Sequence, residues 1–220
     1  MIKCCIFDLD GTLLNTIPSI TYYINKTFRE AGFSEITEED TKRFIGNGAS
    51  KLIERALRHV GAYSESVHKD ILRKYNAVYD SDPYYLTEPY SGIGELVFDL
   101  HRRGVKLAVL SNKPDSTTRL CVSHFFEGKF DAVLGGTDGM PLKPAPDSTE
   151  AVLRILQCAA SETAFIGDSD VDIITGRNAG VALTVGAAWG FRGEEELRLA
   201  GADKVFDTPS DAHCALLLEL

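Results

Sequence analysis

The 220-residue sequence lacks the long apolar runs and the amino-terminal pattern of a membrane or secreted protein. A membrane-spanning helix needs about 18 or more consecutive apolar residues, and no stretch approaches that length. The amino-terminal segment has one lysine, a short apolar run and then two aspartates, which is unlike a secretory signal peptide. We therefore expect a cytoplasmic protein with no membrane contact.

Cysteines are few and show no pairing pattern. The five of them are odd in number and contain no Cys-x-x-Cys motif, which does not suit a disulfide framework or a zinc site. We predict buried or incidental thiols in a reducing compartment. The five histidines are scattered without ligand spacing, and no cysteine has an evident histidine partner. A thiol catalyst is therefore not favoured.

Basic residues are also in short supply. The chain has 23 Lys and Arg against 32 Asp and Glu, a formal net charge of −9. A nucleic-acid surface needs clustered basic residues, so binding to nucleic acid is not expected. A small anionic substrate remains compatible with this charge, because a pocket with a bound cation reverses the local field.

The spacing of apolar residues divides the chain into two regions. From residue 17 to about 80, apolar residues recur at helical spacing and no segment resembles a strand. From about residue 89 onward, short apolar segments alternate with helical ones, which favours parallel βαβ units. We predict an α/β fold with a doubly wound, Rossmann-like parallel sheet, formed by residues 1–14 and 83–220. A small α-helical domain over residues 15–82 interrupts it after the first strand.

Polar residues follow three predicted strands where each strand ends. They are Asp8 and Asp10, then Ser111 and Asn112, then Asp168 and Asp172. Alone, Asp8-x-Asp10-Gly11 is more typical of a solvated turn. The carboxyl ends of parallel strands, however, meet at one sheet edge, where open α/β sheets bind ligands. Clustered carboxylates repel unless a cation neutralises them, and oxygen ligands suit Mg²⁺. Lys143, on a proline-flanked loop, would complement a phosphate.

Four segments together resemble the motifs of the haloacid dehalogenase superfamily in order and spacing. They are Asp8-Leu9-Asp10-Gly11-Thr12, Ser111-Asn112, Lys143-Pro144 and Gly167-Asp168-Ser169-x-x-Asp172. The helical domain resembles the small α-helical cap of that superfamily. Within the superfamily, the chain most resembles bacterial phosphoglycolate phosphatases, to which its segments 44–49, 89–92 and 110–114 are similar.

The resemblance implies a Mg²⁺-dependent phosphomonoester hydrolase that works through an aspartyl-phosphate intermediate. Asp8 would be the nucleophile, and a carboxylate needs no base to activate it at neutral pH. Asp10 would protonate the leaving alkoxide and then accept a proton from water. Mg²⁺ would bind Asp8, Asp168 and the main-chain carbonyl of Asp10.

The resemblance also implies how the substrate is held. Asp172 would fix Lys143 or a metal-bound water. In the cap, Asn47 and Lys51 are candidates for contact with a substrate carboxylate, although a turn residue and a solvated helix face account for them equally well. The groups expected to hold the phosphoryl oxygens are Ser111, the main chain of Asn112, and Lys143.

The favoured substrate is 2-phosphoglycolate, and the expected partner is a small phosphorylated metabolite, with the chain a monomer or homodimer. The alternatives are a phosphatase for another small ester or pyrophosphate, a phosphomutase of the beta-phosphoglucomutase type, or a non-catalytic phosphate-binding module. Related mutases carry a histidine in the cap hinge, and residues 15–21 contain none. A non-catalytic module would have lost a core acid or Lys143. One departure from the pattern is Asn15, where many relatives have Asp after the Gly-Thr.

Overall fold

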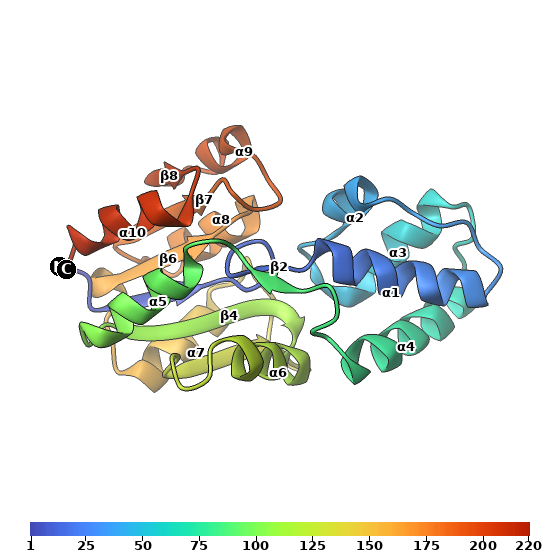
Figure 1. Cartoon of the computed structure of the whole chain (residues 1–220), viewed down its shortest axis with the longest axis horizontal. Helices are drawn as coiled ribbons and strands as arrows, with labels where there is room; N and C mark the ends of the chain where they lie inside the picture. Colours follow the sequence, from blue (N-terminus) through green and yellow to red (C-terminus); the bar gives the residue numbers. More distant parts are fainter. The chain divides into compact units, whose positions relative to one another are not determined.

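A computed structural model describes all residues from 1 to 220. The chain forms two compact units, one made of Met1–Asn15 with Pro89–Leu220 and the other of Thr16–Glu88 (Figure 1). We call them the α/β unit and the helical unit. No helix is both long enough and apolar enough to cross a bilayer.

The α/β unit is built on one six-stranded parallel sheet with the strand order β5-β4-β1-β6-β7-β8. Counted along the chain without the two short strands β2 and β3, this is the order 3-2-1-4-5-6 of a doubly wound Rossmann-type sheet. The predicted fold class is therefore confirmed. The strands are β1 (Cys4–Phe7), β4 (Lys106–Pro114), β5 (Ala132–Gly136), β6 (Thr163–Gly167), β7 (Leu183–Ala187) and β8 (Lys204–Phe206).

Strand β1 is fully buried at the centre of the sheet, paired with β4 on one side and β6 on the other. Successive side chains of a strand point to opposite faces. Cys5 and Phe7 accordingly join one hydrophobic cluster, and Cys4 and Ile6 join another. The first residue after β1, Asp8, continues the pairing, because its amide donates to the carbonyl of Ile166 at 2.9 Å.

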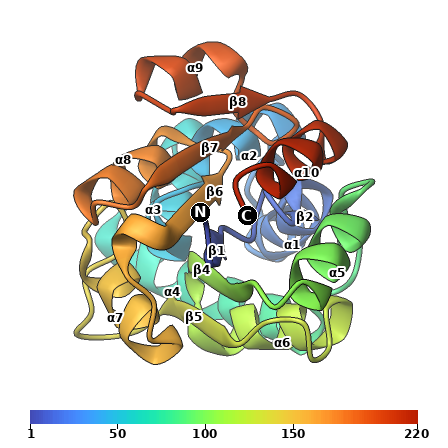
Figure 2. The same ribbon diagram turned by 90° about the vertical axis from the view of Figure 1, so that its left-hand side faces the viewer.

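Helices cover both faces of this sheet (Figure 2). The cluster that contains Phe7 also holds buried residues of α5, α6 and α10, whereas the cluster with Ile6 contains the apolar face of α7. Helix α8 packs on β6 and β7, and α9 on β7 and β8. The bounds are α5 (Ile93–Arg102), α6 (Asp115–Phe125), α7 (Asp147–Leu156), α8 (Asp170–Asn178), α9 (Glu194–Leu199), α10 (Pro209–Leu217) and a 3₁₀ turn, η1 (Ala160–Glu162).

The helical unit has four helices around its own apolar cluster, which includes Ile24, Phe28, Ile53, Leu57 and Ile71. They are α1 (Ile17–Glu30), α2 (Glu38–Phe44), α3 (Gly48–His59) and α4 (Glu65–Ser81). Thr37 and Ser64 are the N-caps of α2 and α4, and their side chains accept hydrogen bonds from the amides of Asp40 and Val67. The chain passes between the units at β2 (Leu14–Asn15) and β3 (Glu88–Pro89), which pair as a small sheet.

One strand differs from the prediction that Ser111 and Asn112 follow it. Strand β4 continues to Pro114, with an irregularity in its pairing after Leu110, so Ser111 and Asn112 lie within it rather than after it. Strand β7 begins only at Leu183, because the amide of Val181 still donates to the carbonyl of Gly176 and so closes helix α8.

Candidate active site

The predicted site residues of the α/β unit come together at the carboxyl edge of the sheet. Asp8 follows β1, Ser111 and Asn112 are in β4, and Asp168 follows β6. These are the three central strands, and β1 is the strand at which the order of the sheet reverses. This is the position at which open α/β sheets bind ligands.

Lys143 lies at the centre of this cluster, in the loop before α7. Its ammonium Nζ donates to Asp8 Oδ1 at 2.7 Å, to Asp172 Oδ1 at 2.6 Å and to the carbonyl of Leu110 at 3.0 Å. The side chains of all three charged residues are at most 10% exposed. Lys143 therefore joins two carboxylates from different elements inside the protein.

Two neighbours hold Lys143 and Asp172 in place. The side-chain amide of Asn112 accepts from the Lys143 amide at 2.8 Å and donates to its carbonyl at 3.1 Å, so it ties the Lys143 loop to β4. Asp172 closes a capping box at the start of α8, where its Oδ2 accepts from the amide and hydroxyl of Ser169. The capping box leaves Oδ1 directed at Lys143.

Asp168 is held by a backbone amide and a hydroxyl, and two glycines pack closely against it. Its Oδ2 accepts from the Phe191 amide at 2.8 Å, and Oδ1 accepts from the Thr12 hydroxyl at 3.3 Å. A Cβ added at Gly190 would lie 2.3 Å from Asp168 Cβ, and one at Gly11 would lie 2.3 Å from Oδ2. The sequence reasoning missed the Gly190–Phe191 contribution, although an aromatic-flanked glycine after a strand was a visible signal.

The cluster carries more negative than positive charge. Oxygens of Asp8, Asp168 and Asp172 lie within 4.8 Å of one another, and all three residues are buried. Burial raises the pKa of Asp8 to about 7, although the Lys143 ammonium opposes the shift. Burial and the charges of Asp172 and Asp8 raise the pKa of Asp168 well above its ordinary value. Burial opposes the charge on Lys143, but Asp172 and Asp8 outweigh it and raise its pKa.

This donor set fits a divalent cation. All the ligand atoms are oxygens, as Mg²⁺ prefers, and the three buried carboxylates have one buried ammonium, that of Lys143, beside them. A bound cation would lower the pKa of Asp8 and Asp168 and keep both ionised. Gly11 and Gly190 leave no space for a further side chain against Asp168.

Asp10 lies apart from this group of carboxylates. Gly11 has φ +92°, so the chain turns directly after Asp10 and does not remain extended. The Asp10 carboxylate accepts from Lys113 Nζ at 3.0 and 3.3 Å through its two oxygens. The sequence reasoning did not assign a role to Lys113. Ser111, which is 4% exposed, accepts from the Lys113 amide through its hydroxyl.

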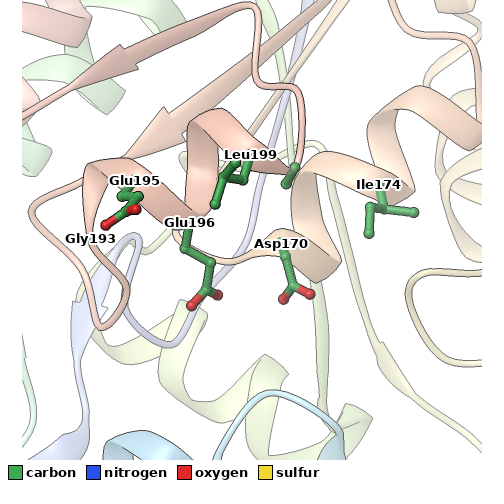
Figure 3. A pocket seen from close by; sticks show the side chains of 7 residues that line it. Asp170, Ile174, Gly193, Glu195, Glu196 and Leu199 are labelled. Atoms are coloured by element: carbon green, nitrogen blue, oxygen red, sulfur yellow. The ribbon is translucent and has the colours of Figure 1, made fainter.

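Asp170 does not join the carboxylate cluster. It is the first residue of α8, and its Oδ1 accepts from the Val171 amide. Its side chain lines a separate hollow between α8 and α9 (Figure 3). The other lining residues are Ile174, Gly193, Glu195, Glu196, Leu199 and Ala200.

The two cap candidates already have partners within the helical unit. Asn47 Oδ1 accepts from Arg55 Nη2 at 2.8 Å. Lys51 Nζ donates to Glu54 Oε2 at 2.9 Å, and its side chain is 59% exposed. Their predicted contact with substrate remains a proposal.

Comparison with known proteins identifies the family. Residues 5–185 match the haloacid dehalogenase-like hydrolase family. The phosphoglycolate phosphatase of Vibrio parahaemolyticus is 31% identical over 215 residues, which cover 96% of this chain and 94% of that protein. The phosphoglycolate phosphatase of Cereibacter sphaeroides is 34% identical over 184 residues, covering 82% of this chain and 83% of the relative.

A solved structure agrees with these relatives. A Lactobacillus delbrueckii protein assigned as a phosphoglycolate phosphatase has a TM-score of 0.91 and 32% identity, covering 97% of this chain and 98% of its own. The chain belongs to the haloacid dehalogenase-like hydrolase family. It is an enzyme of the phosphatase type and resembles the phosphoglycolate phosphatases of that family.

Proposed function

We propose that this protein is a Mg²⁺-dependent phosphomonoester hydrolase that forms an aspartyl-phosphate on Asp8 and acts on 2-phosphoglycolate. The observation that carries the proposal is the buried arrangement of Asp8, Lys143 and Asp172 beside Asp168. It joins a carboxylate nucleophile to a fixed cation and an oxygen-rich metal site.

In the first step, an Asp8 carboxylate oxygen attacks phosphorus. A bond forms between that oxygen and phosphorus, and the bond between phosphorus and the ester oxygen breaks. The leaving alkoxide takes its proton from the Asp10 carboxyl group. Asp8 suits this role because it lies at the end of the central strand, with its backbone fixed by β6.

In the second step, a water molecule attacks the phosphorus of the aspartyl-phosphate. Asp10, now a carboxylate, accepts a proton from that water, and the bond between phosphorus and the Asp8 oxygen breaks. Inorganic phosphate leaves, and Asp8 is again a carboxylate. Asp10 therefore serves as acid and then as base, and both roles require that its carboxyl group be held at one place.

The phosphoryl oxygens would be held by Ser111, the main chain of Asn112, and Lys143. The Lys143 ammonium is fixed by Asp172 Oδ1, and the Lys143 loop is fixed by the Asn112 side chain. Asp172 would therefore act through Lys143. Removing one partner of a buried ion pair leaves an uncompensated charge, so the two residues depend on each other.

Asp8, Asp168 and the main-chain carbonyl of Asp10 would hold the metal ion. When bound, Mg²⁺ supplies positive charge that offsets the repulsion between carboxylates and phosphate and polarises a phosphoryl oxygen. The donor set and the shortage of buried positive charge support this assignment.

The substrate assignment rests on the relatives, which are named phosphoglycolate phosphatases. The α/β unit, as catalytic core, would perform the reaction, and the helical unit, as cap, would select the substrate by closing over it. Asn47 and Lys51 are the cap side chains proposed to contact the carboxylate of the substrate. Cytoplasmic location and a monomeric or dimeric state remain predictions.

A panel of phosphate esters assayed with purified protein and Mg²⁺ tests the proposal. We expect a much higher kcat/KM for 2-phosphoglycolate than for pyrophosphate, nucleotides or hexose phosphates. Equal values of kcat/KM across the panel would contradict the substrate assignment but not the assignment of phosphatase activity. Phosphate release that persists in Asp8→Asn would contradict the assignment of Asp8 as the nucleophile.

A further inference from the structure

Only two lysines of the protein are buried, and each binds one of the two catalytic aspartates. Lys143 is 5% exposed and binds Asp8, and Lys113 is 8% exposed and binds Asp10. The Lys113 ammonium reaches both oxygens of the Asp10 carboxylate, at 3.0 and 3.3 Å. The side chains of this pair are 5% and 14% exposed, so water screens their attraction little.

The backbone of Lys113 is fixed on every side. It lies in the irregular part of β4, between Leu110 and Pro114. Its amide donates to the Ser111 hydroxyl at 3.2 Å, and its carbonyl accepts from Thr118 Oγ1 at 3.2 Å. A Cβ at Gly135 would lie 2.7 Å from that carbonyl, so the neighbouring strand also packs closely against it. The Lys113 ammonium is therefore attached to a backbone that is held firmly in place.

Asp10, in contrast, lies outside the six-stranded sheet, directly before a turn, and forms an isolated β-bridge with Leu14. It is the third residue after the central strand β1 and precedes Gly11, which has a left-handed φ of +92°. Its carboxyl group is partly exposed and terminates a side chain with two rotatable bonds. A cation that binds both oxygens fixes the plane and position of such a group.

We propose that Lys113 is a positioning residue for Asp10, which holds its carboxyl group at the leaving-group oxygen and the attacking water. The inference rests on the proposed function, because it assigns Asp10 the acid and base roles described above. Lys113 makes no bond to phosphorus and transfers no proton in this account. Its effect passes through the placement of Asp10, and misplacement of a reacting group by about 1 Å costs on the order of 10²-fold in rate.

A purely structural ion pair predicts a different pattern. Removing one partner of a buried pair lowers stability, and a general loss of folded enzyme reduces turnover of every substrate equally. Loss of acid catalysis depends on the substrate, because an alkyl phosphate has a poor leaving group that needs a proton and p-nitrophenyl phosphate has a good one that does not. Comparing the two substrates therefore separates the roles.

The test uses the full-length enzyme with Mg²⁺ and measures kcat/KM, which reports the steps up to departure of the leaving group. For Lys113→Met we expect a loss on the order of 10²-fold with the best alkyl phosphate of the panel and of less than about threefold with p-nitrophenyl phosphate. Lys106→Met is the matched control. Lys106 is on the same strand and is paired with Asp131 at 2.8 Å, but half exposed, and we expect changes within about twofold on both substrates.

Equal losses on the two substrates, or no loss on either, would overturn the inference. If Lys113→Met does not fold, Lys113→Gln keeps a hydrogen-bond donor without the charge and carries the same comparison. The double variant Asp10→Asn with Lys113→Met adds a second readout. We expect it to be no slower than Asp10→Asn alone, because residues that act as a unit are not additive, and multiplied losses would contradict this.

The outcome is distinguishable from failure of the proposed function. If wild-type enzyme releases no phosphate, or if Asp8→Asn keeps full activity, the proposed function is wrong. If wild type is active and depends on Asp8 while Lys113→Met behaves like Lys106→Met, only the role of Lys113 is wrong.

Discussion

The two units of the molecule use charge in opposite ways. The α/β unit buries Asp8, Asp168, Asp172, Lys113 and Lys143. Ion pairs of the helical unit, such as Lys51 with Glu54 and Arg73 with Asp70, have at least one partner at the surface. Buried charges are costly to desolvate, whereas exposed pairs contribute little either way. The α/β unit therefore carries a desolvation cost that the proposed chemistry would explain, and the helical unit relies on its apolar core.

The largest expected effect comes from the proposed nucleophile. Asp8→Asn should lower kcat by on the order of 10⁴-fold or more, since an amide cannot attack phosphorus at neutral pH. The matched control is Asp170→Asn, which changes an acid of the same region that lines a separate hollow. It should stay within about threefold. Steady-state assays with Mg²⁺ measure both variants. Equal losses would show that Asp8 is no more important for activity than an acid outside the buried cluster.

Metal removal should have a nearly comparable effect. Exhaustive chelation leaves three buried carboxylates with one neighbouring ammonium, and two of them have a raised pKa. Activity should fall to background and return when Mg²⁺ is added, while far-UV circular dichroism stays unchanged because the helices do not depend on the ion. Retained turnover in chelator would contradict the metal assignment.

A third test addresses the close approach around Asp168. In Gly190→Ala the new Cβ would lie 2.3 Å from Asp168 Cβ and from the Gly11 carbonyl, so the carboxylate must shift. We expect a loss on the order of 10²-fold in kcat, with weaker Mg²⁺ activation. Gly193→Ala is the control, because nothing lies within 4 Å of its Cβ. A normal Gly190→Ala enzyme would show that the site tolerates movement of Asp168.

Lys51 tests whether the helical unit selects the substrate. Its ion pair with Glu54 is exposed and therefore easily exchanged for a substrate carboxylate. Lys51→Ala should raise KM for 2-phosphoglycolate severalfold and leave p-nitrophenyl phosphate, which has no carboxylate, unchanged. Lys42→Ala, which removes a similar exposed pair with Glu39, should change neither. An unchanged KM in Lys51→Ala would remove this residue from the specificity proposal.

The smallest effect is expected at a helix cap. Thr37 accepts from the Asp40 amide at 3.1 Å and opens α2. Thr37→Ala should lower the free energy of unfolding by about 1 kcal/mol without changing kcat. Denaturant unfolding and a standard assay check both parts. A change in kcat would show that the stability of the helical unit and the chemistry are coupled.

The sequence predicted the sheet and most of the charged cluster because both depend on local patterns. Apolar runs identify strands, and polar residues at their ends must meet at one edge. Asp8, Ser111, Asp168 and Asp172 are the residues found in this way, and Lys143 was found as a lysine on a proline-flanked loop.

The remainder depends on tertiary geometry that no local pattern encodes. Lys113 follows Ser111 and Asn112 in sequence, but its aim at Asp10 depends on the irregular end of β4 and the Gly11 turn. Gly190 matters because its loop folds onto Asp168. The extent of β7 depends on how the preceding helix ends. The sequence gives the identity of each of these residues but not the contacts that they make in the folded protein.

The most direct test of the account is to trap the phosphoryl group on the enzyme. In Asp10→Asn, p-nitrophenyl phosphate should still phosphorylate Asp8, because its leaving group needs no acid, but hydrolysis should be slow because the base is absent. Rapid quenching and peptide mass spectrometry should then find one phosphoryl group on Asp8. Stoichiometric release of p-nitrophenol with no phosphoryl group on the protein, or with the group on another residue, would contradict the account.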